Sequence, residues 1–396
     1  MLRHLRGLVR TVGPTVIVIL ALEVVLRIGA FLWYDGSLYY LFYGFHGLVG
    51  KVGISPWWVS DGGYFKFPPD YVLHGAAGQG AETATINSLG FRGPDFEPRK
   101  SATTFRIIAL GGSSTFGFHN EDTETYPYQL QQILEDRYPG RDIEVINAGF
   151  PYYNTGSVRS LLEAELLDYK PDLLTLYAAY NDASWPLEVG PAFRLAVWLQ
   201  QHSMIYLVLK QTVITDQRVY AVLGLMRRWF PTSPDRPALE RRAEWVAARY
   251  RSNVEAIADL ARQRGIVLVL VRQPVTAHYK EPQQYSSYQE EYETVLRKLS
   301  EGQPLAPFEV HLLVHRRLIA ELDAIARERD LPIVDNIAIV DRDRSRLTSW
   351  VHLTAEANFR LAEALVPAIE PYLGAAAQES EGVRSGRDAL PLKGGR

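Results

Sequence analysis

The feature that most constrains this chain is an apolar run that ends in four small residues, Arg106-Ile-Ile-Ala-Leu-Gly-Gly-Ser-Ser-Thr-Phe-Gly117. An apolar segment of the kind found in β-strands leads straight into Gly-Gly-Ser-Ser, a turn that a helix can follow. A strand with this ending presents one side chain and free backbone N–H groups at the same point in space. The pattern therefore indicates a nucleophile displayed at a strand tip, with Ser113 as the candidate.

Short apolar segments alternate with longer amphipathic stretches from about residue 104 onward. The strand candidates are Phe105–Leu110, Ile143–Asn147, Leu173–Tyr177, Ile266–Val271 and Pro332–Val334. The helix candidates are Tyr126–Arg137, Val158–Leu167, Leu239–Arg264 and Phe308–Arg329. This alternation predicts an α/β fold, a three-layer αβα sandwich with a mainly parallel five-stranded sheet. In such sheets, functional sites lie at the carboxyl ends of the strands.

The composition excludes several classes of protein. With 396 residues, 47% of them hydrophobic and 22% charged, the chain can bury one main globular core and carry further attachments. Its formal net charge of −3 gives no electrostatic case for nucleic acid binding. Because the chain has no cysteine, disulfides, thiolate metal sites and a cysteine nucleophile are excluded.

The N-terminus predicts a membrane anchor. Three arginines precede a mostly apolar run from Val12 to Trp33, which is about the length of a helix that crosses a bilayer, and Asp35 follows it. The positive-inside rule then places the N-terminus in the cytoplasm and the main domain outside the cytoplasmic membrane, on the periplasmic or extracellular side. Glu23 and Arg27 lie within the run and can pair on one helix face. A cleaved signal peptide and a soluble core helix are the alternatives.

The chain is expected to divide into four parts. These are a cytoplasmic flank and membrane anchor over residues 1–35, an interfacial segment over 36–103, the main domain over 104–373 and a disordered tail over 374–396. Residues 185–237 interrupt the alternation and are expected to form a helical insertion. A second insertion, residues 278–307, is a candidate loop over the site.

Four short blocks resemble the SGNH/GDSL hydrolase superfamily, over about residues 104–372. The blocks are Gly111-Gly-Ser-Ser-Thr115, Asn147-Ala-Gly-Phe150, Ala179-Tyr-Asn-Asp182 and Val351-His-Leu-Thr354. The resemblance implies that Ser113 is the nucleophile and His352 the general base. It also implies that the Gly149 N–H and the Asn181 side-chain amide donate to the oxyanion, with no cofactor. Upstream, the motif Asn87-Ser-Leu-Gly-Phe-Arg-Gly93 resembles the segment before the domain in a membrane-anchored subgroup.

These groups suit acyl-ester chemistry. A serine hydroxyl is a weak nucleophile at neutral pH and needs an adjacent base, for which a neutral imidazole is well suited. The tetrahedral intermediate needs donors aimed at its oxygen, and the Ser113 N–H, the Gly149 N–H and the Asn181 amide would supply three.

Each residue also has a simpler explanation when taken singly. Ser113 can be a helix cap, Gly149 and Asn181 can serve a turn, and His352 can be a surface residue at a helix start. The histidines His311 and His315 sit four residues apart without an acidic third ligand at motif spacing, so no metal site is expected.

Three positions depart from the family pattern. The position three residues before the histidine usually holds a carboxylate that orients the imidazole, and here it is Ser349. A serine hydroxyl can fix the tautomer but stabilises the imidazolium less. Asp341 and Asp343 are candidate substitutes for the missing carboxylate. In addition, Gly112 stands where many members have Asp, and Ala179 stands where the family has Gly.

These patterns together predict a membrane-anchored serine esterase that hydrolyses ester-linked acyl groups of a carbohydrate or a lipid through an acyl-enzyme. O-acyl transfer to an envelope polysaccharide is one alternative, because a sugar hydroxyl can replace water. A catalytically weak or inactive scaffold protein of an envelope assembly is the other, because Ser349 occupies the acid position. The expected partners are the acylated substrate and the membrane, and no nucleic acid.

Overall fold

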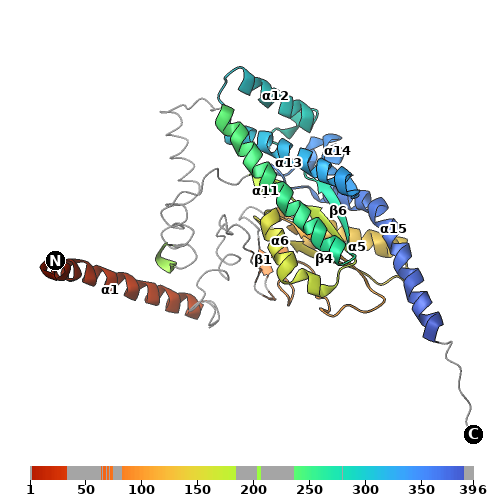
Figure 1. The fold of residues 1–396 in the computed structure, drawn as a ribbon, viewed down its shortest axis with the longest axis horizontal. Helices are drawn as coiled ribbons and strands as arrows, with labels where there is room; N and C mark the ends of the chain where they lie inside the picture. Colours follow the sequence, from red (N-terminus) through yellow and green to blue (C-terminus); the bar gives the residue numbers. More distant parts are fainter. Residues whose placement is uncertain are drawn as a thin grey trace, which may run out of the picture. The chain divides into compact units, whose positions relative to one another are not determined.

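The protein is described by a computed structural model that covers residues 2–33, 64, 66–67, 69–70, 72–74, 83–183, 203–206, 236–278 and 280–387 (Figure 1). The chain divides into two compact units, residues 1–60 with 186–232 and residues 61–185 with 233–396. Most of the predicted insertion at 185–237, and residues 36–60 of the predicted interfacial segment, lie outside the described residues.

The first unit contains helix α1 (Leu2–Trp33). As predicted, Arg27 pairs with Glu23 on this helix, at 2.9 Å between Nη2 and Oε1. The Glu23 carboxylate also accepts hydrogen bonds from the backbone N–H groups of Met204 and Ile205, at 2.7 and 3.1 Å. Among the described residues, no helix has the length and apolar character that crossing a bilayer requires, so the predicted anchor gains no support here. The predicted location outside the cytoplasmic membrane stays a prediction.

The second unit is built on a five-stranded sheet, which confirms the predicted α/β architecture. The strands are β3 (Phe105–Gly111), β4 (Ile143–Gly149), β5 (Leu173–Tyr177), β6 (Val267–Arg272) and β7 (Ile333–Asp335). They run parallel throughout, in the order β4-β3-β5-β6-β7. Every residue of β3 and β5 is buried, as expected for central strands covered by helices on both faces. A separate hairpin pairs β1 (Val72–His74) with β2 (Thr83–Thr85).

Helices cover both faces of this sheet (Figure 1). Ile107 and Ala109 of β3 pack in one buried cluster with α5 and α15, while α11 contacts α6, α13 and β6 on the opposite face. The α-helices are α4 (Ser113–Phe116), α5 (Tyr126–Arg137), α6 (Thr155–Ala164), α7 (Tyr180–Ala183), α11 (Arg236–Gln263), α12 (Tyr288–Ser300), α13 (Pro307–Arg329), α14 (Asn336–Asp341) and α15 (Ala355–Arg387). The 3₁₀ turns are η1 (Asp122–Glu124), η2 (Leu166–Tyr169), η3 (Pro282–Gln284) and η4 (Arg344–Arg346).

The strand order has a physical consequence for the site. The chain builds β4 on one side of β3 and then returns to build β5 on the other side, so the connections leave the sheet in opposite directions at β3 and β5. In open parallel sheets this reversal opens a crevice at the carboxyl ends of the two strands. Ser113 follows β3 and Asn181 follows β5, so both lie beside that crevice.

The motif at residues 87–93 supports the segment that follows Ser113. Its arginine, Arg92, is 4% exposed and donates to the carbonyl oxygens of Phe116, Gly117 and Asn120 at 2.9, 2.8 and 2.7 Å. Its Nε also pairs with Asp122, at 2.7 Å. Carbonyl groups at a helix end have no partner within the helix. Arg92 therefore satisfies the end of α4 and fixes the chain on the side of the helix away from Ser113.

Replacing this buried cation by an apolar side chain of similar length should destabilise the protein. We expect Arg92→Met to lower the free energy of unfolding by about 3 kcal/mol or more, because four backbone carbonyls and the Asp122 carboxylate each lose a hydrogen bond. Urea denaturation measures the change. The matched control is Arg159→Met, whose ion pair with Glu163 is about 40% exposed, and it should cost less than about 0.5 kcal/mol. Equal losses in the two variants would contradict the assigned role of Arg92.

Candidate active site

The structure brings Ser113 and His352 into contact across 239 residues of sequence. Ser113 opens helix α4 directly after β3, and His352 lies in the loop that leads into α15. The distance between Ser113 Oγ and His352 Nε2 is 2.8 Å, which is a hydrogen bond. A hydroxyl and an imidazole at this distance form the pair that a serine nucleophile needs.

His352 is held at its other ring nitrogen by Ser349. The distance from Ser349 Oγ to His352 Nδ1 is 2.7 Å, and the same oxygen accepts the His352 backbone N–H at 3.2 Å. The ring also lies against Phe118 and His119, with centroid distances of 5.1 and 5.2 Å. Burial, with a smaller contribution from the neighbouring His119, lowers the pKa of His352 to about 3. The imidazole is therefore neutral at physiological pH and able to accept a proton.

The two candidate substitutes for the missing carboxylate are engaged elsewhere, so that expectation was wrong. Asp341 accepts hydrogen bonds from Arg344 and from the backbone N–H of Tyr288, at 3.0 and 2.9 Å. Asp343 accepts from the hydroxyl and the backbone N–H of Ser345, at 2.6 and 3.0 Å. Both carboxylates serve the local folding of the loop rather than the imidazole.

Asn181 lies beside the nucleophile turn, in the four-residue helix α7 that follows β5. Its side-chain Nδ2 donates to the carbonyl of Tyr153 at 2.9 Å. A Cβ atom placed on Gly112 would lie 2.9 Å from this nitrogen and 3.0 Å from the Tyr153 oxygen. The glycine that replaces the family's Asp therefore leaves the space into which the Asn181 amide fits. One amide hydrogen bonds Tyr153, and the other is left for a ligand.

Gly149, the predicted second donor, ends strand β4. Its N–H donates to the side-chain oxygen of Asn147 at 3.0 Å. A Cβ atom here would lie 2.2 Å from the backbone nitrogen of Phe116, so only glycine fits beside α4. The amide side chain of Asn147 would have to move before this N–H could serve an oxyanion, and its role as a donor stays a prediction.

Asp182 supports the next helix, as expected for a structural acceptor. Its carboxylate accepts the backbone N–H of Thr155 at 3.1 Å and the Thr155 hydroxyl at 2.5 Å. Burial raises the pKa of Asp182 to about 7, against the effect of these hydrogen bonds. The residue therefore anchors the start of α6 next to Asn181.

One residue at the site escaped the sequence analysis. His119 belongs to none of the motifs named from the sequence, yet its ring packs edge-on against His352. It has a positive φ of 69°, unusual for a residue with a side chain. The available signal is its position six residues after Ser113, on the loop that follows α4.

His311 and His315, for which no metal site is expected, stack on each other inside the protein. His315 Nδ1 lies 2.9 Å from the hydroxyl of Tyr288, and burial lowers the pKa of both His311 and His315. In the part of the chain that the structure describes, no three His, Cys, Asp or Glu side chains are grouped to hold a metal ion.

Comparison with known proteins places the site within a family. The family model described as the GDSL-like lipase/acylhydrolase family matches residues 109–358, well over half of the chain. This range includes the turn at Ser113 and the loop at His352. A comparison with curated proteins gives no match.

Several solved structures are similar to the chain at low identity. A lipase/acylhydrolase from Enterococcus faecalis is 15% identical, with 67% of this chain and 95% of that chain covered and a TM-score of 0.39. A GDSL-like lipase from Bacteroides thetaiotaomicron is 12% identical, with 67% and 88% covered and a TM-score of 0.36. A catalytic mutant of an acetylxylan esterase from Geobacillus stearothermophilus is 14% identical, with 67% and 93% covered and a TM-score of 0.37. Because these TM-scores are below 0.5, the assignment rests on the family model.

The lowered pKa of His352 can be measured directly. In protein labelled with ¹³C-histidine, we expect the ring to titrate far below the ordinary value of 6.5 and to remain neutral at pH 5. A His352→Gln variant assigns the resonance. Because the unfolded chain binds this proton more tightly than the folded one, the contribution to stability is present above pH 6.5 and is lost as pH falls toward 3. A midpoint near 6.5 would show that the imidazole is not desolvated.

Proposed function

The chain belongs to the GDSL-like lipase/acylhydrolase family, and on that premise we propose that it is a serine esterase that removes ester-linked acyl groups from a carbohydrate or a lipid. The observation that carries the proposal is the hydrogen bond of 2.8 Å between Ser113 and His352. A neutral imidazole in contact with a serine hydroxyl is the arrangement that activates this nucleophile.

The reaction proceeds in two half-reactions. In the first, Ser113 Oγ bonds to the carbonyl carbon of the ester while its proton passes to His352 Nε2. The tetrahedral intermediate then collapses, and the imidazolium returns the proton to the departing alcohol. In the second, water gives its proton to His352 and attacks the acyl-enzyme, which releases the acid and restores the Ser113 hydroxyl. No cofactor is needed for this sequence of bond changes.

The developing oxyanion needs donors at the nucleophile turn. The backbone N–H of Ser113 lies at the first position of α4, and the Asn181 amide lies close against Gly112. Donors of this kind each lower the barrier by about 3 kcal/mol in serine hydrolases. The short approach of Asn181 to the turn supports its assignment as the side-chain donor.

Ser349 takes the place of the usual carboxylate beside His352 Nδ1. For Nε2 to accept the Ser113 proton, the hydrogen of the neutral ring must sit on Nδ1 and donate to Ser349 Oγ. A hydroxyl can also donate, which would put the hydrogen on Nε2 and block the base. Ser349 Oγ therefore orients the ring but fixes its tautomer less strictly than a carboxylate, and it leaves the imidazolium without an opposite charge.

The proposed activity is tested with p-nitrophenyl acetate and acetylated oligosaccharides. We expect acetate release by the wild type and a loss of at least about 10³-fold in kcat for Ser113→Ala, because the nucleophile is removed. The control is Ser101→Ala, an exposed serine in a turn with Thr103, which should leave the rate unchanged. Acetylated acceptor in place of acetate would instead identify an acyltransferase. Absence of both products would contradict an enzyme and favour the scaffold, and full activity of Ser113→Ala would contradict Ser113 as the nucleophile.

Restoring a carboxylate at position 349 should improve the base. We expect Ser349→Asp to raise kcat about tenfold, because a carboxylate at Nδ1 fixes the tautomer and stabilises the imidazolium. The same carboxylate raises the pKa of His352, so the acid limb of the profile of kcat/KM against pH should move to higher pH. Ser349→Ala is the companion variant and should be slower than the wild type. If Ser349→Ala keeps the wild-type rate and pH profile, the hydroxyl does not orient the base.

A further inference from the structure

The loop that carries His352 is held by its backbone carbonyls. Four consecutive carbonyl groups, from Trp350 to Leu353, each accept a hydrogen bond. The donors are the Thr276 N–H to Trp350 at 2.9 Å, the Ser114 hydroxyl to Val351 at 3.2 Å, the Thr348 N–H to His352 at 2.9 Å and Asn120 Nδ2 to Leu353 at 3.0 Å. Such a run outside a helix or strand leaves the loop little freedom, because the backbone on both sides of the imidazole is fixed.

One of these donors comes from the residue next to the nucleophile. Ser114 is 4% exposed and lies in α4 directly after Ser113. Its Oγ donates to the Val351 carbonyl and accepts from the side chain of Gln273, whose Nε2 lies 3.0 Å away. The Ser114 hydroxyl therefore joins the nucleophile helix to the residue that precedes the base.

Gln273 connects this hydroxyl to the third element of the site. It follows β6, is 3% exposed, and accepts the backbone N–H groups of Ala179 and Tyr180 at 2.8 and 2.7 Å. Two N–H donors converge on one side-chain atom, which identifies it as the amide oxygen and leaves the nitrogen to donate to Ser114. These two N–H groups immediately precede Asn181, so one buried amide fixes the turn that carries the proposed oxyanion donor.

The hydrogen bonds form a chain with a single direction. The amide nitrogen of Gln273 donates to Ser114 Oγ, and the Ser114 hydroxyl donates to the Val351 carbonyl. A group at position 273 must accept two N–H groups and donate one hydrogen, and an amide side chain supplies both capacities. Loops after β3, β5 and β6 are thereby tied to the loop of His352.

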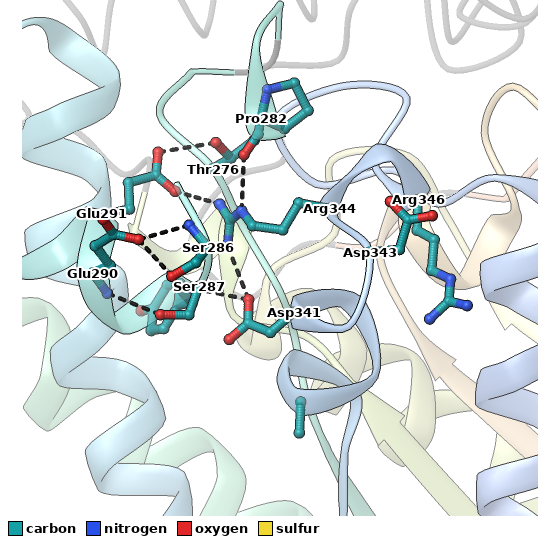
Figure 2. A network of polar contacts seen from close by, with 12 residues as sticks. Thr276, Pro282, Ser286, Ser287, Glu290, Glu291, Asp341, Asp343, Arg344 and Arg346 are labelled. Carbon is teal, nitrogen blue, oxygen red and sulfur yellow. Dashed lines mark hydrogen bonds and ion pairs between the residues drawn. The ribbon is translucent and has the colours of Figure 1, made fainter. Parts of the chain in front are cut away.

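A separate anchor holds the Trp350 carbonyl through Thr276, whose N–H donates to it. Figure 2 shows Thr276 beside the pair of Glu291 and Arg344. The Thr276 hydroxyl and the Ala277 N–H donate to Glu291 at 2.9 and 2.8 Å. Glu291 in turn pairs with Arg344, and both side chains are almost fully buried. This anchor contains no group next to Ser113 or Asn181. The Trp350 carbonyl is thus held by an anchor apart from the nucleophile, whereas the Ser114 hydroxyl ties the Val351 carbonyl directly to the helix that carries Ser113.

We propose that Gln273 and Ser114 are positioning residues for the esterase reaction. Their hydrogen-bond chain holds His352 Nε2 within hydrogen-bond distance of Ser113 Oγ, and it also fixes the turn of Asn181. The inference rests on the proposed function, because it concerns the geometry of that reaction. Both side chains are buried, and their hydrogen bonds go to each other and to backbone groups rather than to the Ser113 hydroxyl or the imidazole. Their effect is on the fraction of molecules in which base, nucleophile and oxyanion donor are aligned.

The chain predicts a specific kinetic pattern. Ser114→Ala should lower kcat about tenfold with KM unchanged, because the base loop loses its link to α4 while Gln273 keeps both backbone donors. Gln273→Leu should lower kcat further, by about 10²-fold, because the Asn181 turn is released and the Ser114 hydroxyl loses the donor that orients it toward the Val351 carbonyl. The double variant should be no slower than Gln273→Leu alone, since both changes interrupt the same chain.

Tyr288→Phe is the matched control for the loss of a buried hydroxyl. The Tyr288 side chain is 3% exposed and bonds His315, apart from the hydrogen-bond chain. It should lose stability comparable to that of Ser114→Ala and keep the wild-type kcat. The rate of reaction with a fluorophosphonate provides a second readout, which needs no substrate binding and should fall in step with kcat.

The outcomes separate this inference from the proposed function. An inactive Ser113→Ala together with wild-type kcat in Ser114→Ala would overturn the hydrogen-bond chain and leave the esterase intact. Fully additive losses in the double variant would also overturn it. Full activity of Ser113→Ala would instead refute Ser113 as the nucleophile. Should Gln273→Leu fail to fold, Ser114→Ala alone decides, because it keeps the two backbone N–H groups satisfied.

Discussion

The rest of the site depends on a neutral imidazole held against one serine hydroxyl. The contact of 2.8 Å between Ser113 and His352 joins the first residue of a four-residue helix to a loop residue 239 positions further along the chain, and neither short segment could hold its place alone. The parallel sheet solves part of this problem, because it brings the ends of β3 and β5 to one edge. Hydrogen bonds to the backbone carbonyls of the His352 loop then hold the imidazole at this edge.

The absence of a carboxylate at position 349 changes the electrostatics of the pair. In a triad with an acid, the negative charge raises the pKa of the imidazole and stabilises the imidazolium. Here burial acts without that compensation, and the pKa falls to about 3. The base stays available over a wide range of pH but gains a proton at a higher energetic cost. In the proposed reaction, precise placement of the ring by neutral hydrogen bonds then contributes more to the rate.

The elements that could be predicted from the sequence are those whose own residues determine their structure. Strands β3 and β5 are buried and mostly apolar, with Arg106 and Thr175 as their polar members, and the predicted ranges match them within one residue. The turn at Ser113 follows from its two glycines. The parts that were missed depend on distant contacts: the partner of the Gly149 N–H, the ring of His119 against His352, and the amide of Gln273. Helix α12 lies within a segment expected to be a loop, and it is held there by the buried pair of Glu291 and Arg344.

The most direct test of the account is the site of covalent labelling by a serine-directed fluorophosphonate. The account predicts one adduct per chain, found by mass spectrometry on the peptide that contains Ser113 and absent after the protein is unfolded before labelling. An intact, folded protein that takes up no label, or that is labelled on a different residue, would contradict the claim that Ser113 and His352 form a nucleophile and its base.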